Sequence, residues 1–123
     1  MKTITTLLII LIAFGTAFGE EIKMPTVPDA IKNEIKKAAR AKWPGNYEMQ
    51  LFHYENNLEA WQMIQLIRGN LIRPSENETE KVINEEMSQI FKKAEKKWPG
   101  NYEMQLFQIK NQVEAFMKME GVE

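Results

Sequence analysis

The sequence predicts an all-α fold, in which two tandem αα-hairpin repeats pack as one four-helix domain after an N-terminal signal peptide. Three observations predict it: an apolar run near the N-terminus, a segment KWPGNYEMQLF that occurs twice, and apolar residues at helical spacing around both copies. We expect a signal peptide over residues 1–19 and a single helical domain over 20–123. The repeats within it are expected at about 26–69 and about 75–121.

The N-terminal segment predicts export. A lysine precedes an unbroken apolar run from Leu7 to Phe14, and the small residues Ala17 and Gly19 precede a cleavage site. This run is shorter than the roughly 20 residues that a membrane-spanning helix needs. We therefore expect a secreted or periplasmic protein that is cleaved after Gly19, with an uncleaved membrane anchor as the alternative.

Charge and cysteine content restrict the class of protein. The chain has 16 Lys and Arg against 17 Asp and Glu, and it has no Cys. Nucleic-acid-binding proteins usually carry a net basic surface, so we expect no nucleic-acid partner. Without disulfides, the exported domain must be held together by apolar burial alone.

The first predicted helix covers about 27–42. Thr26, with Asp29 three residues later, resembles a capping box at its start. The residues WPG at 43–45 end it, because the residue before a proline is pushed out of the helical region. Asn46 is expected to cap a second helix.

The second helix is expected to reach Arg68, with Gly69 as its stop. Ser75 and Glu78 then form a capping box for the third helix. The residues WPGN at 98–101 end this helix and cap a fourth, which runs to about position 120. The repeated segment, at 42–52 and 97–107, therefore encodes a helix end, a tight turn and a helix start.

The second and fourth helices are apolar on two faces. On the second helix, one apolar face begins at Tyr47, and the opposite face carries Met49 and Phe52. The fourth helix carries their counterparts Met104 and Phe107 on the corresponding face. A helix that is apolar on both sides is buried between two layers or lies at an interface, which makes a homodimer one expected arrangement. Asn56 and Asn111 fall within this second face, and either fix its register or are partly exposed.

The repeated turn is the strongest candidate binding site. Its aromatic and polar residues are Trp43, Tyr47, Glu48 and Gln50 in the first copy, and Trp98, Tyr102, Glu103 and Gln105 in the second. One interpretation is a recognition patch, duplicated across a pseudo-two-fold axis, that binds through aromatic surface and directional hydrogen bonds. The other is a structural turn, in which the aromatic rings pack over the backbone and the polar side chains cap it.

Catalytic and metal-binding chemistry have little support in the sequence. His53 is the only histidine, so we expect no metal site and no cofactor, and we assign no catalytic residue. Whether the protein is an enzyme is not decided by the sequence, and the non-enzymatic interpretation is favoured. In a rival hypothesis, the protein binds or cleaves cell-envelope polymers, and the carboxylates of Glu48 and Glu103 are the groups that it uses.

The block W-P-G-N-Y-E-M-Q, followed by an apolar helix with Ala-Trp or Ala-Phe, resembles short exported bacterial proteins of unassigned function. In those proteins a similar W-P-x-[ND]-Y-x-M-Q motif opens a helix, and the resemblance implies no activity. We expect a non-enzymatic secreted or periplasmic interaction module, whose partner is an unknown protein or cell-envelope ligand. The alternatives are the polymer-binding or lytic protein and a self-assembling structural protein. Membrane contact is expected only through an uncleaved signal segment.

Overall fold

The computed structural model describes residues 24–72, 74 and 76–121, and the predicted signal peptide lies outside this part of the chain. The described residues form four helices and no strand, so the predicted all-α fold is confirmed. The helices are α2 (Asp29–Lys42), α3 (Tyr47–Leu71), α4 (Glu78–Lys97) and α5 (Tyr102–Met119).

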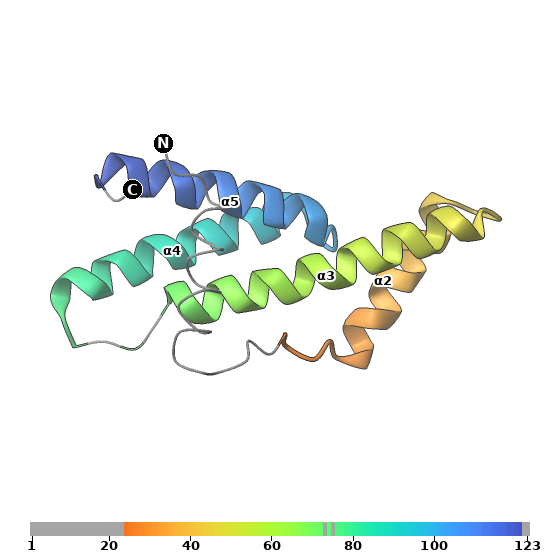
Figure 1. Ribbon diagram of the computed structural model, residues 1–123, viewed down its shortest axis with the longest axis horizontal. Coiled ribbons are helices and arrows are strands. Elements are labelled where there is room, and N and C mark those ends of the chain that lie inside the picture. The colour runs from red at the N-terminus through yellow and green to blue at the C-terminus, as the bar shows by residue number, and fades with distance from the viewer. Residues whose placement is uncertain (1–23, 73, 75, 122–123) are drawn as a thin grey trace.

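The four helices pack as a bundle around α3, which contacts α2, α4 and α5 (Figure 1). The α2 helix covers the N-terminal half of α3, whereas α4 and α5 pack together over its C-terminal half (Figure 1). The α5 helix runs in the same direction as α3 but begins beside the middle of α3, not level with its start (Figure 1). The pair α4–α5 is therefore shifted along α3 relative to α2–α3, and this shift does not match the pseudo-two-fold axis that the recognition-patch interpretation assumed.

Two helix starts differ from the prediction. The α2 helix begins at Asp29 with Pro28 as its N-cap and no side-chain cap, so the box based on Thr26 is wrong. Proline is tolerated there because a helix start leaves its first N–H groups unpaired in any case. The α4 helix is capped by Asn77, whose Oδ1 accepts from the backbone N–H groups of Thr79 and Glu80 at 2.8 and 3.3 Å. Asn77 therefore replaces the predicted Ser75 cap.

The α3 helix continues through Gly69 to Leu71, although Gly69 was expected to end it. Gly69 does not adopt the positive φ of a helix-terminating glycine. The residues that follow it, Leu71 and Ile72, pack against the core. Tertiary packing thus extends the helix by nearly one turn past a residue that favours stopping it.

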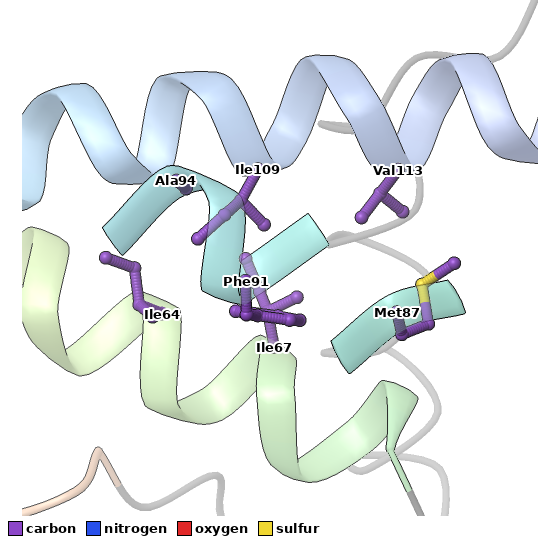
Figure 2. Packing of buried hydrophobic residues seen from close by; sticks show 7 residues of the cluster. All are labelled: Ile64, Ile67, Met87, Phe91, Ala94, Ile109 and Val113. Atoms are coloured by element: carbon purple, nitrogen blue, oxygen red, sulfur yellow. The ribbon is translucent and has the colours of Figure 1, made fainter. Parts of the chain in front are cut away.

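The main core lies where α3, α4 and α5 meet (Figure 2). Its seven buried side chains are Ile64 and Ile67 from α3, Met87, Phe91 and Ala94 from α4, and Ile109 and Val113 from α5. On the other side of α3, Ile35 and Ala39 of α2 are buried. The second apolar face predicted on α3, to which Ile67 also belongs by helical spacing, is divided by this arrangement, because Ile67 is buried but Phe52 remains 62% exposed.

Candidate functional site

The two copies of the repeated segment fold into the same turn, here called the first turn (43–46) and the second turn (98–101). Gly45 and Gly100 have φ angles of 76° and 73°, a conformation that other residues adopt only with strain. The asparagine that follows each glycine caps the next helix: its Oδ1 accepts from the backbone N–H three residues later, at 3.2 Å in both copies. The backbone of the turn is therefore encoded locally.

The predicted site residues Gln50 and Gln105 serve this turn. Each donates from Nε2 to the carbonyl oxygen of the tryptophan seven residues earlier, at 2.8 Å in both copies. These carbonyls stand at the C-terminal ends of α2 and α4, where helices leave acceptors unpaired. Both glutamine side chains therefore join the end of one helix to the start of the next, as the structural interpretation predicts.

Trp43 and Trp98 occupy equivalent positions but have different polar partners. The preceding lysine of each copy lies over the indole, with its Nζ 5.8 Å from the ring centroid in the first turn and 5.5 Å in the second. Trp98 also donates from Nε1 to Gln108 Oε1 at 3.0 Å. The residue equivalent to Gln108 in the first copy is His53.

The second turn is docked on α3 by one polar side chain, Asn57, which is completely buried. Its Oδ1 accepts from the backbone N–H groups of Tyr102 and Glu103, at 3.0 and 3.2 Å. Its Nδ2 donates to Glu103 Oε1 at 3.1 Å and to the carbonyl oxygen of His53 at 2.9 Å. Asn57 thus caps α5 from another helix, and the carboxylate of Glu103 is bound within this contact.

The register role that the sequence suggested for Asn56 and Asn111 falls instead to Asn57. Asn56 is half-buried and Asn111 is exposed. A signal for Asn57 was present in the sequence, because the buried residues of α3 are Asn57, Ala60, Ile64 and Ile67, at spacings of three and four. A polar residue at the end of such an apolar stripe is a candidate for a buried contact.

Tyr102 fastens the second turn to α2. Its hydroxyl donates to Glu34 Oε1 at 3.3 Å. Burial raises the pKa of Tyr102 to about 12, with further contributions from the charge and hydrogen bond of Glu34 and from the charge of Glu95. Gly100 approaches the same carboxylate so closely that a Cβ atom there would lie 3.1 Å from Glu34 Oε1.

A groove of about 720 Å³ opens beside this contact. Its walls include the aromatic rings of Trp61 and Tyr102 and charged groups of both signs, among them Glu34 and Arg68. Gln105 also lines it. Of the predicted ligand-binding residues, the structure therefore brings Tyr102 and Gln105 together at one groove.

In the part of the chain that the structure describes, no other hairpin packs on the first turn as α2 and α3 pack on the second. Tyr47 and Leu51 are 78% and 57% exposed, and Glu48 is exposed beside them. The structure thus places the predicted site residues of the two copies in two different surroundings. Those of the second copy lie in a contact between helices, and those of the first copy stand at one end of the molecule.

His53 is half-buried near the start of α3. Its pKa is lowered by burial and by the charge of Lys42, and the carboxylate of Glu103 opposes this shift. Among the described residues, no cluster of His, Asp and Glu could hold a metal ion. The contact that His53 makes at the docked turn is through its backbone carbonyl oxygen, which accepts from Asn57 Nδ2.

Comparison of the chain with protein-family models, with curated proteins and with solved structures finds no match. Within the described part of the chain, no helix combines the length and apolar character needed to cross a membrane.

Proposed function

We propose that the protein is an exported, non-enzymatic interaction module built from two tandem αα-hairpin repeats, and that its first turn binds a protein partner. One observation carries this proposal: Tyr102, Gln105 and Leu106 of the second copy are packed against other helices, whereas the equivalent Tyr47, Gln50 and Leu51 of the first copy are more exposed. The shared backbone geometry of both turns supports the tandem-repeat description. The apolar N-terminal run of the sequence supports export.

The uncovered surface has the chemistry of a protein-binding site. Tyr47 and Leu51 lie one helical turn apart on the same face of α3, and both are more than half exposed. Large apolar side chains gathered at one exposed place commonly mark an interaction surface, and tyrosine adds a polar group to its apolar ring. Glu48 adds one negative charge beside them.

Site-specific photo-cross-linking in the cells that produce the protein tests this proposal. A benzophenone amino acid replaces Tyr47 in one variant and Phe107 in the control. Phe107 lies in the same repeated segment and is 60% exposed, but it stands on the docked copy. We expect a discrete adduct from position 47 that is absent or much weaker from position 107. Equal adducts from both positions, or none from position 47, would refute the proposal.

The same preparation tests export. The mature protein should begin at Glu20, as read by mass spectrometry of its N-terminal peptide. Recovery of a protein that retains the first 19 residues would contradict cleavage at the expected site.

A further inference from the structure

We propose that the partner of the first turn is a second copy of this chain, bound head to tail in the way that the second turn is bound within one chain. This inference rests on the proposed interaction function and identifies its partner. It starts from the difference between the two copies of the repeated segment. Gln105 is 5% exposed and Leu106 is half-buried, whereas Gln50 is half-buried and Leu51 is 57% exposed. Identical side chains in identical turns differ here only in what covers them.

The surface that covers the second turn is here called the first seat. It belongs to α2 and α3, and its contacts are the Asn57 cap and the hydrogen bond from Tyr102 to Glu34. Trp61 and Ile64 of α3 line the groove at the same place. The first seat therefore combines two polar partners with an apolar wall.

An equivalent surface, the second seat, lies 55 positions further along the chain, on α4 and α5. The residues of the second seat that are equivalent to Glu34, Asn57, Trp61 and Ile64 are, in the same order, Gln89, Gln112, Phe116 and Met119. These four residues line one groove of about 460 Å³. The two grooves therefore lie at equivalent positions of the two repeats, and only the first of them has a turn beside it within the described chain.

The second seat is uncovered where the first is covered. Ile64 is 2% exposed, and its counterpart Met119 is 85% exposed. Ala60 is buried on the same face of α3, and its counterpart Ala115 is exposed. Within the described residues 24–72, 74 and 76–121, one chain therefore carries one turn without a seat and one seat without a turn.

The replacements in the second seat keep the chemistry that the turn requires. The amide of Gln112 has the same acceptor and donor groups as that of Asn57, so it can accept from the N–H groups that open α3 and donate to Glu48. The amide oxygen of Gln89 can accept from the hydroxyl of Tyr47, as Glu34 accepts from Tyr102. Phe116 and Met119 retain the apolar wall.

The geometry of the chain makes this contact heterologous. The first turn stands at one end of the long axis, and the C-terminal part of α5 lies towards the other end (Figure 1). Because the turn and the seat are different surfaces, each bound copy presents a further free turn and a further free seat. The α5 helix ends at Met119, whereas α3 continues to Leu71, so the second seat is shorter and binding between chains should be weaker than the equivalent contact within one chain.

Two variants that each block one surface test the proposal by light scattering after size exclusion. Leu51→Glu blocks the first turn and Ala115→Glu blocks the second seat, and both positions are exposed, so helical circular dichroism should be retained. Ala30→Glu, at an exposed position of α2, is the matched control. We expect the parent and the control to grow beyond twice the monomer mass with concentration. Each blocked variant alone should remain a monomer.

An equimolar mixture of the two blocked variants gives the decisive result. One variant retains the seat and the other retains the turn, so the mixture should form a dimer that grows no further. A parent that stays monomeric at every concentration, variants that still associate alone, or a mixture that stays monomeric would each overturn the inference. The cross-linking experiment separates this failure from failure of the proposed function: an adduct with a different protein, from a monomeric parent, would refute self-association but support the interaction module.

Discussion

Asn57 lies in the middle of α3 and caps the first turn of α5 at Tyr102, 45 positions later in the chain. Two hydrogen bonds meet at Tyr102. Its backbone N–H donates to the amide oxygen of Asn57 on α3, and its hydroxyl donates to Glu34 on α2. The second turn is thereby held against two helices that precede it in the sequence. The position of α4 and α5 along α3 follows from this docking, because a shift by one helical turn would leave the buried amide oxygen of Asn57 without the N–H groups of α5.

Replacement of Asn57 by alanine should destabilise the fold by about 2–3 kcal/mol, because it leaves two N–H groups and a carboxylate without their buried partner. Asn56→Ala provides the control at a half-buried neighbouring position and should change stability by less than about 0.5 kcal/mol. Chemical denaturation followed by circular dichroism measures both. Similar midpoints for the two variants would show that the Asn57 contact contributes little.

The glycines of the two turns should be sensitive to alanine, and the glycine inside α3 should not. Gly45→Ala and Gly100→Ala each force a side chain into the left-handed region, at a cost of about 1–2 kcal/mol. Gly100→Ala should cost more, because the new Cβ meets Glu34. Gly69→Ala has open space and helical backbone, and should stabilise by about 0.5–1 kcal/mol. Thermal unfolding of the three variants tests this order.

The raised pKa of Tyr102 predicts a loss of stability at alkaline pH. The folded protein keeps the phenolic proton up to about pH 12, whereas the unfolded chain releases it near pH 10. The folded state therefore binds more protons between these values, and the free energy of unfolding falls as pH rises through them. Absorbance titration of a Tyr47→Phe, Tyr54→Phe variant isolates Tyr102, the remaining tyrosine.

Glu34→Gln is the matched variant for this titration. It removes the negative charge and should move the Tyr102 midpoint down towards its ordinary value, although burial of the ring remains. An unchanged midpoint would mean that Glu34 does not act on the phenol.

The lowered pKa of His53 predicts a second pH dependence of the free energy of unfolding, in which stability is lost as the pH falls and not as it rises. Because its pKa is lowered in the folded protein, the unfolded chain takes up a proton first as pH falls below about 6.5. The unfolded state then binds more protons, so the free energy of unfolding falls from neutral pH towards pH 5.5. Proton NMR gives the pKa directly, since the chain has one histidine. His53→Gln, the residue present in the second copy, should reduce this slope, and an equal slope in parent and variant would contradict the prediction.

Much of the fold could be predicted from local sequence. The helices, both turns and the caps at Asn46 and Asn101 depend on neighbouring residues, whose preferences for φ, for capping and for burial act over a few positions. The predictions at Thr26 and Gly69 were wrong where local preference competes with packing. The α2 helix starts at Asp29, after the predicted capping residue Thr26. The α3 helix continues past Gly69 because Leu71 and Ile72 pack against the core.

The candidate site could be predicted only as residue types. Sequence identified the repeated aromatic turn, and both copies adopt it with the same hydrogen bonds. It could not distinguish the copies, because the eleven residues are the same and local physics treats them alike. The role of Asn57 was missed for the same reason, since its four partners come from its own helix and from residues 45 and 46 positions away.

The sequence by itself determined the all-α class, the two turns and the residues that cap and close them, because each depends on contacts between residues no more than seven positions apart. The tertiary structure alone decided that α4 and α5 lie shifted along α3, that Asn57 is buried, and that Tyr102 is docked while Tyr47 remains exposed. These outcomes depend on which surfaces meet across the chain. That choice is made by burial and buried hydrogen bonding summed over whole helices, which no short segment contains.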